Sequence, residues 1–320
     1  MRSMIRILFL LAAFGLIAGL VFGFFGFVHP AFDTFAHFRW HFALGLLAMA
    51  IAGLLLRIRR APFILLVFAT LGVWQSGANN RIGNYSGPDG GAVAEAAGAR
   101  FRLLQFNLRF DNPRRQEVID FIVDTDADIL MLNETSRLWE DALEKLNERY
   151  PQRFHCPEWG IIGGSMIFSK FPMRGGKDYC GPYAAMGFTE VEIGGEWVEL
   201  GVVHLRWPWP ASGPEQIEEN RPRLESLGRD AIIAGDFNAA TWSHSVAQIA
   251  SHGDLNIQRG FGGTWMYKWF PGSLAPLLGL PIDNILAKGR FTVHSVETLP
   301  AVGSDHLPIL SHVLFGKKAP

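Results

Sequence analysis

The first 80 residues constrain the fold most, because they contain three apolar runs separated by basic residues. Residues 7–28 include no charged side chain and are numerous enough to cross about 30 Å of hydrocarbon at about 1.5 Å per residue. A second run lies between Arg39 and Arg57, and a third extends over 61–77. One such run could be a buried helix of a soluble protein. Three in succession predict a membrane anchor of three transmembrane helices over residues 1–78.

Basic residues predict how this anchor is oriented. Arg2 and Arg6 precede the first run, and Arg57, Arg59 and Arg60 separate the second run from the third. Since positively charged loops stay on the cytoplasmic side, both groups are expected in the cytoplasm. With three spans, the rest of the chain then lies on the other side. The prediction is a multi-pass protein of the inner (cytoplasmic) membrane whose catalytic domain is periplasmic or extracellular.

The remainder of the chain is acidic. The first 80 residues hold six Lys/Arg and one acid, which leaves 23 basic and 29 acidic residues for 81–320. This is a poor electrostatic match for duplex DNA, whose binding requires many phosphates to be neutralised. Both cysteines, Cys156 and Cys180, lie in this exported part, where oxidation is permitted. They form either a disulfide or two unpaired thiols, and the sequence leaves both possibilities open.

Residues 79–99 are rich in Gly and Ala and have no apolar period, which predicts a flexible linker. The domain that follows, over residues 100–316, mixes strand-like and helix-like segments. Many strands and few helices indicate an α+β fold in which two mixed sheets pack on each other with helices outside, an α/β/β/α sandwich of four layers. The predicted strands are 101–107, 129–133, 165–169, 184–193, 197–205, 231–234, 282–287, 291–298 and 309–315, and the predicted helices lie around 118–122, 139–150, 215–227 and 243–252.

Polar residues stand where these apolar strands begin or end. A single Asp, Asn or His at a strand end usually belongs to a turn or a helix cap. Six such groups in one chain are different, because a buried carboxylate is costly unless it is paired or bound to a metal. The groups are Gln105–Asn107, Asn133–Glu134, His204, Asp236–Asn238, Asp283–Asn284 and Asp305–His306.

These residue types favour one chemistry. Carboxylate and amide oxygens suit a hard cation such as Mg²⁺, which retains waters and binds through few carboxylates together with a substrate phosphate. An Asp beside a His holds the imidazole in position to exchange a proton. The sequence has no Cys/His cluster with zinc spacing, no Gly-x-Ser-x-Gly motif and no phosphate-binding Gly loop ending in Lys-Ser/Thr. Of the reactions considered, metal-assisted hydrolysis of a phosphate ester is the one that these residues still allow.

The order of these motifs resembles the endonuclease/exonuclease/phosphatase superfamily. The series is QFN (105–107), NE (133–134), GGSMIFS (163–169), VHL (203–205), GDFN (235–238), PIDNIL (281–286) and GSDHLP (303–308). It covers the whole exported part. The segment HLRWPWP and the three leading runs resemble the bacterial membrane-anchored branch with three transmembrane helices, whose substrate is unknown.

The resemblance implies a role for each matching residue. Glu134 would be the main Mg²⁺ ligand, with Asn107 and Asp305 completing or orienting the metal site and Mn²⁺ as a substitute. His306 paired with Asp283 would form half of the acid/base apparatus. The remaining roles fall on Asp236 and Asn238, which would orient the attacking water and the phosphate, and on His204, which would donate to a phosphoryl oxygen or protonate the leaving group. Whether Asp236 or His306 takes the proton from water stays open.

The sequence therefore predicts a Mg²⁺-dependent phosphodiesterase or phosphoesterase whose substrate is a lipid head group, a small phosphodiester or a nucleic acid. Trp207, Trp209, Trp265, Trp269 and Phe270 either contact the bilayer, stack on a substrate ring or pack into the domain's own rim. Two alternatives remain: a nuclease acting on single-stranded or extracellular DNA or RNA, and a catalytically silent, membrane-tethered binding domain. Residues 7–78 are expected to contact the lipid bilayer, and no protein partner can be inferred.

Overall fold

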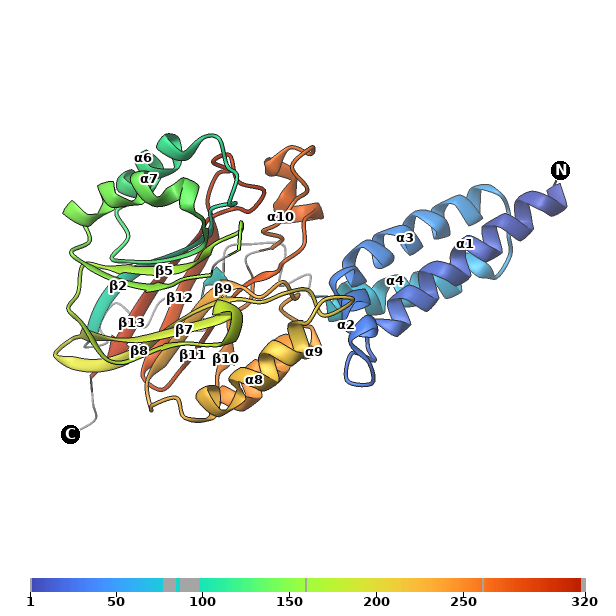
Figure 1. Cartoon of the computed structure of the whole chain (residues 1–320). Coiled ribbons are helices and arrows are strands. Elements are labelled where there is room, and N and C mark those ends of the chain that lie inside the picture. Colours follow the sequence, from blue (N-terminus) through green and yellow to red (C-terminus); the bar gives the residue numbers. More distant parts are fainter. Residues whose placement is uncertain (1, 77–84, 87–97, 159, 261, 318–320) are drawn as a thin grey trace.

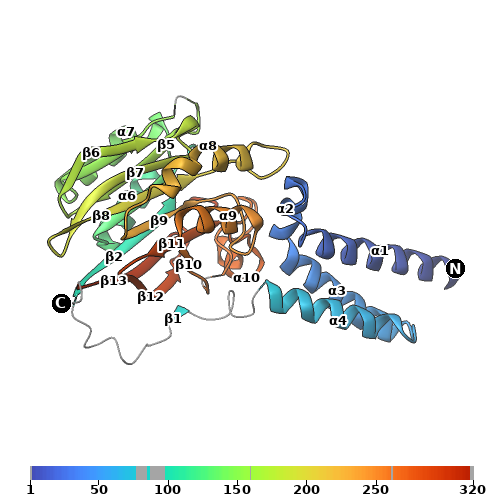
Figure 2. The same ribbon diagram turned by 90° about the horizontal axis from the view of Figure 1, so that it is seen from below.

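A computed structural model describes residues 2–76, 85–86, 98–158, 160–260 and 262–317. The predicted linker over 79–99 lies mostly outside these residues. A bundle of helices, drawn blue in Figure 1, projects from one side of a larger domain built on two sheets. Its elements are α1 (Arg2–Phe22), α2 (Pro30–His37), α3 (Arg39–Leu55) and α4 (Ala61–Gln75). Figures 1 and 2 show α1, α3 and α4 side by side and the short α2 at the junction with the domain.

The bundle corrects the prediction of three transmembrane helices. Among the described residues, α1 is the one helix both long and apolar enough to cross a membrane by itself. The second predicted span is α3, which has 17 residues and is apolar and long enough only if it is counted together with α2, from which it is bent by 60°. The third, α4, has 15 residues and is about 22 Å long, short of the roughly 30 Å of a hydrocarbon layer. Apolar composition therefore located the helices, but not their lengths or the bend.

Two mixed sheets form the centre of the larger domain. In the first sheet the strands run in the order β1 (Tyr85–Ser86), β12 (Phe291–Thr298), β13 (Ile309–Gly316), β2 (Gly98–Asn107), β3 (Ile129–Thr135), β5 (Gly164–Ser169) and β4 (Gln152–Cys156). In the second the order is β10 (Asn256–Ile257), β11 (Asp283–Lys288), β9 (Ala231–Asp236), β8 (Glu196–His204), β7 (Met186–Ile193) and β6 (Met173–Cys180). Each sheet contains one parallel pair, β2 with β3 and β8 with β9.

Helices cover the outer face of each sheet, so the predicted α/β/β/α layering is confirmed. The first sheet packs against α6 (Arg115–Thr125), α7 (Glu140–Glu144) and the 3₁₀ turns Arg137–Trp139 and Lys145–Glu148. The second packs against α8 (Gly213–Glu225) and α9 (His244–Gly253). A third apolar cluster fills the space between the sheets. The remaining short elements are the 3₁₀ turns Pro182–Ala184 and Gly272–Leu274 and the helix α10 (Ala275–Leu278).

This layering explains the continuous apolar strands. Strand β9 is buried along its whole length, because one face meets the other sheet and the opposite face meets α8 and α9. A strand buried on both faces cannot alternate polar and apolar side chains. Where such a strand ends, its last residues are still held by a rigid sheet, which fixes the direction of their side chains.

Edge strands β4 and β6 were absent from the sequence prediction. Their sequences, QRFHC and MRGGKDYC, are polar and show no clear alternation. Cys156 at the end of β4 and Cys180 at the end of β6 form a disulfide. Because the two strands belong to different sheets, this bond links the sheets at their edges. Of the two possibilities left open by the sequence, the structure has the disulfide.

Candidate functional site

Strand register brings the predicted polar residues to one edge of the two sheets. Asn107 is paired with Asn133 where the parallel strands β2 and β3 end. In the second sheet, Asp236 lies between His204 on β8 and Asp283 on β11. Both parallel pairs end at the same edge, so side chains separated by up to 200 positions meet there.

Glu134 is directed into this edge by an irregularity in β3. The pairing of β3 with β5 shifts between Asn133 and Thr135, and Glu134 adopts a left-handed backbone conformation with φ 58°. Such a bulge re-aims one side chain out of the regular alternation. The carboxylate of Glu134 then accepts hydrogen bonds from the backbone N–H of Phe110 at 2.8 Å and from the amide of Asn107 at 3.0 Å.

Asp236 is the most buried acid of this group facing the pocket, with 1% of its surface exposed. Its Oδ2 accepts from the amide of Asn107 at 3.0 Å, and its Oδ1 accepts from the backbone N–H of Asn238 at 2.8 Å. Burial raises the pKa of Asp236 to about 7; the charges of Asp283 and Glu134 act in the same direction, and the charge of His306 acts against it. Asn107 therefore links the carboxylates of Glu134 and Asp236 through one NH₂ group. Because that amide presents nitrogen to both acids, its role as a metal ligand stays a prediction.

The backbone on both sides of Asp236 adopts conformations that suit Gly235 and Asn238. Gly235 has φ 155°, and a Cβ at this position would collide with the carbonyl oxygen of Val203. Asn238 has φ 46°, a left-handed conformation that Asn tolerates better than most residues. The side-chain amide of Asn238 donates to the carbonyl of Leu205 at 2.7 Å. The GDFN motif thus holds Asp236 against neighbouring β8.

His306 and Asp283 form a buried pair. The Nδ1 atom of His306 lies 2.8 Å from Oδ2 of Asp283, whose Oδ1 accepts from the amide of Gln105 at 2.9 Å. Burial by itself lowers the pKa of His306, but the charges of Asp283 and Asp236 outweigh it and raise this pKa to about 10. Nε2 of His306 lies 3.6 Å from Oδ2 of Asp236. The ring is therefore positively charged at neutral pH and directs its second nitrogen at Asp236.

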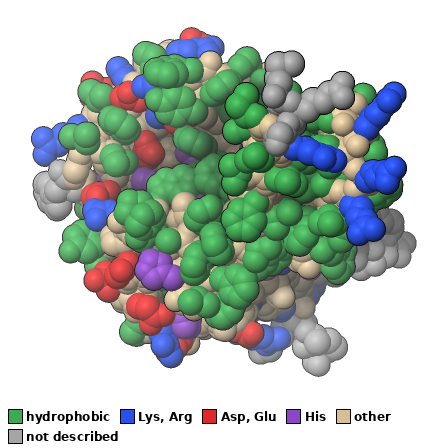
Figure 3. All heavy atoms as spheres, turned by 90° about the vertical axis from the view of Figure 1, so that its right-hand side faces the viewer, with side chains coloured by type: hydrophobic (Ala, Val, Ile, Leu, Met, Phe, Trp, Pro, Cys, Tyr) green, Lys and Arg blue, Asp and Glu red, His purple; other side chains and the backbone are tan. Residues whose placement is uncertain are grey.

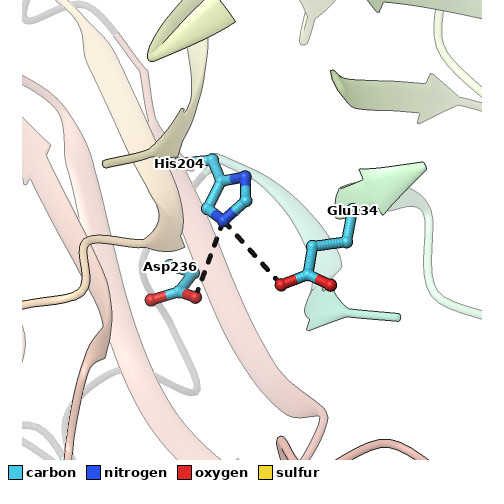
Figure 4. Close-up of side chains that lie close together, drawn as sticks. All are labelled: Glu134, His204 and Asp236. Atoms are coloured by element: carbon cyan, nitrogen blue, oxygen red, sulfur yellow. Dashed lines mark ion pairs between the residues drawn. The ribbon is translucent and has the colours of Figure 1, made fainter. Parts of the chain in front are cut away.

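His204 faces the two linked acids, as Figure 4 shows. Its Nε2 lies 3.9 Å from Oε1 of Glu134 and 3.9 Å from Oδ2 of Asp236. Burial lowers the pKa of His204, although Glu134 acts in the opposite direction. His204 on β8 and His306 in the segment before β13 thus both approach Asp236 but differ in charge.

These groups border a pocket of about 370 Å³. Six of the eight predicted site residues line it: Glu134, His204, Asp236, Asn238, Asp305 and His306. The other two, Asn107 and Asp283, are wholly buried beside it. Asp305 accepts a hydrogen bond from Nε1 of Trp265 at 3.2 Å, but it is in neither of the potential metal-binding groups found among the described residues. Its metal role also stays a prediction.

Two amides without an assigned role prove to support the site. Asn133 accepts from the backbone N–H of Asp236 at 3.0 Å and donates to the carbonyl of Val203 at 3.0 Å, which joins the two sheets. Gln105 holds Asp283. Both amides are completely buried within otherwise apolar strands. An amide inside an apolar strand needs polar partners, so the position of these two residues in the sequence is the signal that could have identified their supporting role.

The residues fit a divalent metal. Ligand atoms of Glu134, His204 and Asp236 lie within 4.8 Å of one another, and those of Asp236, Asp283 and His306 form a second such group. In the first group two carboxylate oxygens converge on one point although burial disfavours their negative charge. A cation between them would offset that cost, and carboxylate oxygens are ligands of hard divalent ions.

A fold of two packed sheets with acids, amides and imidazoles at one edge defines a class of metal-dependent hydrolases that cleave phosphate esters. The sequence profile described as the Endonuclease/Exonuclease/phosphatase family matches residues 104–306. The chain belongs to this family and is a metal-dependent hydrolase acting on phosphate ester bonds. Comparison with curated proteins gave no significant match.

Solved structures share the fold at low sequence identity. A family protein from Bacteroides thetaiotaomicron is 15% identical with a TM-score of 0.54, over 69% of this chain and 100% of that one. Beta toxin from Staphylococcus aureus with bound magnesium ions is 12% identical with a TM-score of 0.51, over 68% and 99%. The catalytic domain of human Nocturnin with a bound sulfate is 17% identical with a TM-score of 0.53, over 68% and 95%. At these identities the likeness concerns the fold.

Proposed function

We propose that the protein is a Mg²⁺-dependent phosphodiesterase or phosphoesterase. The observation that carries the proposal is the meeting of Glu134, Asp236 and His204 with the buried His306–Asp283 pair at one pocket. Mg²⁺ is favoured because the converging ligands are mainly oxygens, and the magnesium ions in the S. aureus beta toxin structure support the choice. Mn²⁺, which accepts the same ligands, would substitute.

The side chains divide the work between them. A bound Mg²⁺ would neutralise charge on the phosphoryl oxygens and favour attack on phosphorus. Asp236, whose pKa is near 7, is suited to take a proton from the attacking water, and Asn238 holds its carboxylate in place. The oxygen of this water bonds to phosphorus while the bond to the ester oxygen breaks. His306, held protonated by Asp283, donates to a phosphoryl oxygen.

His204 faces the same space from β8 and serves as a second donor. Because burial lowers its pKa, its ring is neutral at pH 7 and one ring nitrogen carries hydrogen. A neutral imidazole donates a hydrogen bond to a phosphoryl or leaving oxygen without adding charge. The departing alkoxide takes its proton from the His204 ring or from water.

The test measures metal-dependent turnover. Full-length protein in detergent is assayed with bis-p-nitrophenyl phosphate, with Mg²⁺ and with a chelator. We expect Glu134→Gln to weaken the dependence of activity on Mg²⁺ concentration and His306→Ala to lower kcat by about 100-fold or more. Glu140→Gln, on α7 outside the pocket, is the matched control.

Two outcomes would contradict the proposal. Unaltered Mg²⁺ dependence in Glu134→Gln would refute its assignment as the main ligand. Turnover no higher in the native protein than in His306→Ala would favour a silent binding domain. Single-stranded oligonucleotides belong in the same assay, because the fold is shared with a structure of D. rerio TDP2 bound to a single-strand DNA product.

We further propose that the bundle is inserted in the cytoplasmic membrane, with α1 as the helix that crosses it and the catalytic domain on the periplasmic or outer side. The outer surface of the bundle supports this, since large apolar side chains such as Phe14, Leu55 and Trp74 are more than 70% exposed. A water-soluble protein rarely leaves a continuous surface of this kind uncovered. A reporter fused to the C-terminus tests the orientation: activity of a reporter that works in the cytoplasm alone would contradict it.

A further inference from the structure

Asp33 docks the short helix α2 onto the catalytic domain. It is 2% exposed, and its carboxylate accepts hydrogen bonds from the backbone N–H groups of His244 and Ser245 at 2.6 and 2.9 Å. The hydroxyl of Ser245 donates to the same carboxylate at 2.6 Å. These donors belong to the first turn of α9, where a negative charge also interacts favourably with the helix dipole. A residue of the anchor thus caps a helix that lies more than 200 positions later.

Other contacts join the same two parts of the molecule. The segment of α2 and the first turn of α3 is held by hydrogen bonds to two loops of the domain and to the end of α10. They are Thr34 to the carbonyl of Trp209 at 3.1 Å, Trp242 to the carbonyl of Ala36 at 2.8 Å, Trp40 to the carbonyl of Leu277 at 2.9 Å and His41 to the carbonyl of Leu278 at 2.7 Å. The domain is therefore fixed against the bundle, not merely attached through the linker.

This docking lies beside the pocket. Trp207 lines the pocket together with His204 and Asp236, and its ring also packs on the ring of His37 with 4.8 Å between centroids. The apolar bundle therefore begins next to the pocket. Figure 3 looks at the molecule from the bundle side and shows hydrophobic side chains over much of this face, with Lys and Arg side chains gathered at its upper right and acidic and His side chains mainly toward its left.

A row of aromatic rings leads from the pocket to the outer surface. Trp265 lines the pocket and donates to Asp305. Its ring lies 6.4 Å from that of Tyr267, which in turn lies 5.2 Å from that of Trp269. Exposure increases outward, to 43% at Tyr267 and 80% at Trp269.

Further exposed apolar side chains stand where the domain holds the docked segment. Trp209, Leu277 and Leu278 are 52%, 51% and 39% exposed, and their backbone carbonyls accept the hydrogen bonds from α2 and α3 described above. We call Trp209, Trp269, Leu277 and Leu278 the rim. Since Trp and apolar residues concentrate where protein meets the membrane surface, the rim is continuous with the surface proposed to lie in lipid.

We propose that the pocket takes its substrate from the bilayer, and that this substrate is a phosphate ester in the head group of a lipid. The inference rests on the proposed phosphoesterase function. With the domain fixed at the end of the bundle, the rim lies at the level of the head groups and the aromatic row forms the path from the bilayer surface to the acids. A lipid already confined to that surface reaches the pocket at a high effective concentration.

The experiment uses the full chain reconstituted into vesicles of phosphatidylethanolamine, phosphatidylglycerol and sphingomyelin in equal parts. Release of phosphorylated head groups is compared with hydrolysis of the same lipids carrying two six-carbon chains and with hydrolysis of bis-p-nitrophenyl phosphate. We expect kcat/KM for at least one bilayer lipid to exceed that for its short-chain form at least tenfold. Trp269→Ser should lower lipid hydrolysis at least fivefold and leave bis-p-nitrophenyl phosphate turnover unchanged.

Trp197→Ser is the matched control, because Trp197 is a partly exposed Trp at the opposite end of β8 from His204. It should alter neither rate. Quenching of Trp fluorescence by brominated lipids gives a second reading independent of turnover: Trp269→Phe should reduce the quenching, and Trp197→Phe should not.

Equal rates for long-chain and short-chain lipids, or unreduced quenching in Trp269→Phe, would overturn the inference. So would turnover of bis-p-nitrophenyl phosphate without hydrolysis of any vesicle lipid, in which case the proposed function would stand. Failure to hydrolyse any of these esters would overturn both.

Discussion

Replacing Asp283 with Asn tests the charge pair at the centre of the site. Asp283 is completely buried and bonds His306 through one oxygen and Gln105 through the other. The side-chain oxygen of Gln105 is buried and has no hydrogen-bond partner in the part of the chain that the structure describes, so this amide can turn and accept from the new NH₂ group. Asp283→Asn can therefore keep both hydrogen bonds while the negative charge beside His306 is lost.

The expected size of the effect follows from that single charge. The difference between a charged and a neutral hydrogen bond is about 1–1.5 kcal/mol, and a pair of charges about 4 Å apart interacts by about 4 kcal/mol at an effective dielectric constant of 20. Since 1.36 kcal/mol corresponds to one pH unit, the pKa of His306 should fall from about 10 to between about 7 and 9.

The assay is the pH profile of kcat/KM with bis-p-nitrophenyl phosphate, together with NMR titration of the His306 ring in chelated protein. In the variant, activity should decline with rising pH from about 7–9, where the native enzyme stays active. Asp230→Asn is the control, because Asp230 is a buried carboxylate paired with Arg290 at 2.7 Å near the other end of β9. An alkaline limit that is unchanged in Asp283→Asn, or moved equally in Asp230→Asn, would refute the assignment of His306 as the protonated partner.

Two further predictions concern stability. The folded state binds a proton on His306 more tightly than the unfolded chain does, because the pKa of His306 is about 10 against an ordinary 6.5. The contribution of this proton to the free energy of unfolding is therefore complete below pH 6.5 and is lost as pH rises to 10. The loss is at most about 1.4 kcal/mol per pH unit. Urea unfolding of chelated protein measures this, and His306→Gln should flatten the dependence. Cys156→Ala with Cys180→Ala removes a bond across a separation of 24 residues, and should lower the free energy of unfolding by about 3 kcal/mol; a reductant that lowers the stability of this double variant as much as that of the native protein would contradict the assignment.

How well the sequence predicted each strand depends on what surrounds it. Strand β12 was predicted with its observed bounds, although only Phe291, Val293 and Val296 of it are buried. Strand β9 was predicted apart from the Gly235–Asp236 end, because a strand buried on both faces must be apolar. Edge strands β4 and β6 pair on one side only and can be polar, so nothing in their composition distinguishes them from loops. Their pairing is fixed by neighbouring strands and by the disulfide.

The anchor shows a different limit. The segment between the first two apolar runs was treated as a loop, but it contains α2. Local signals for this helix were present, since Pro30 begins it and Asp33 lies in its first turn. The partner of Asp33 was not predictable, because the capped helix lies more than 200 residues away and no local pattern indicates it. Contacts between distant segments depend on the assembled fold.

The register of five strands explains why the site itself could be predicted from scattered motifs. A strand buried on both faces excludes unpaired acids, so an acid at its end has to meet polar partners supplied by its neighbours. Asp236 finds them in His204 and Asp283, which are its direct partners on the adjacent strands β8 and β11. The first sheet supplies Asn107 in the same way, since it ends beside Asn133 and its amide reaches across to Asp236. The physical constraint that makes each polar residue conspicuous in the sequence is thus the one that forces them together in the fold. It constrains catalytic groups but not the rim, whose exposed side chains meet no such requirement, and for that reason the substrate has to be found by measuring hydrolysis at a bilayer.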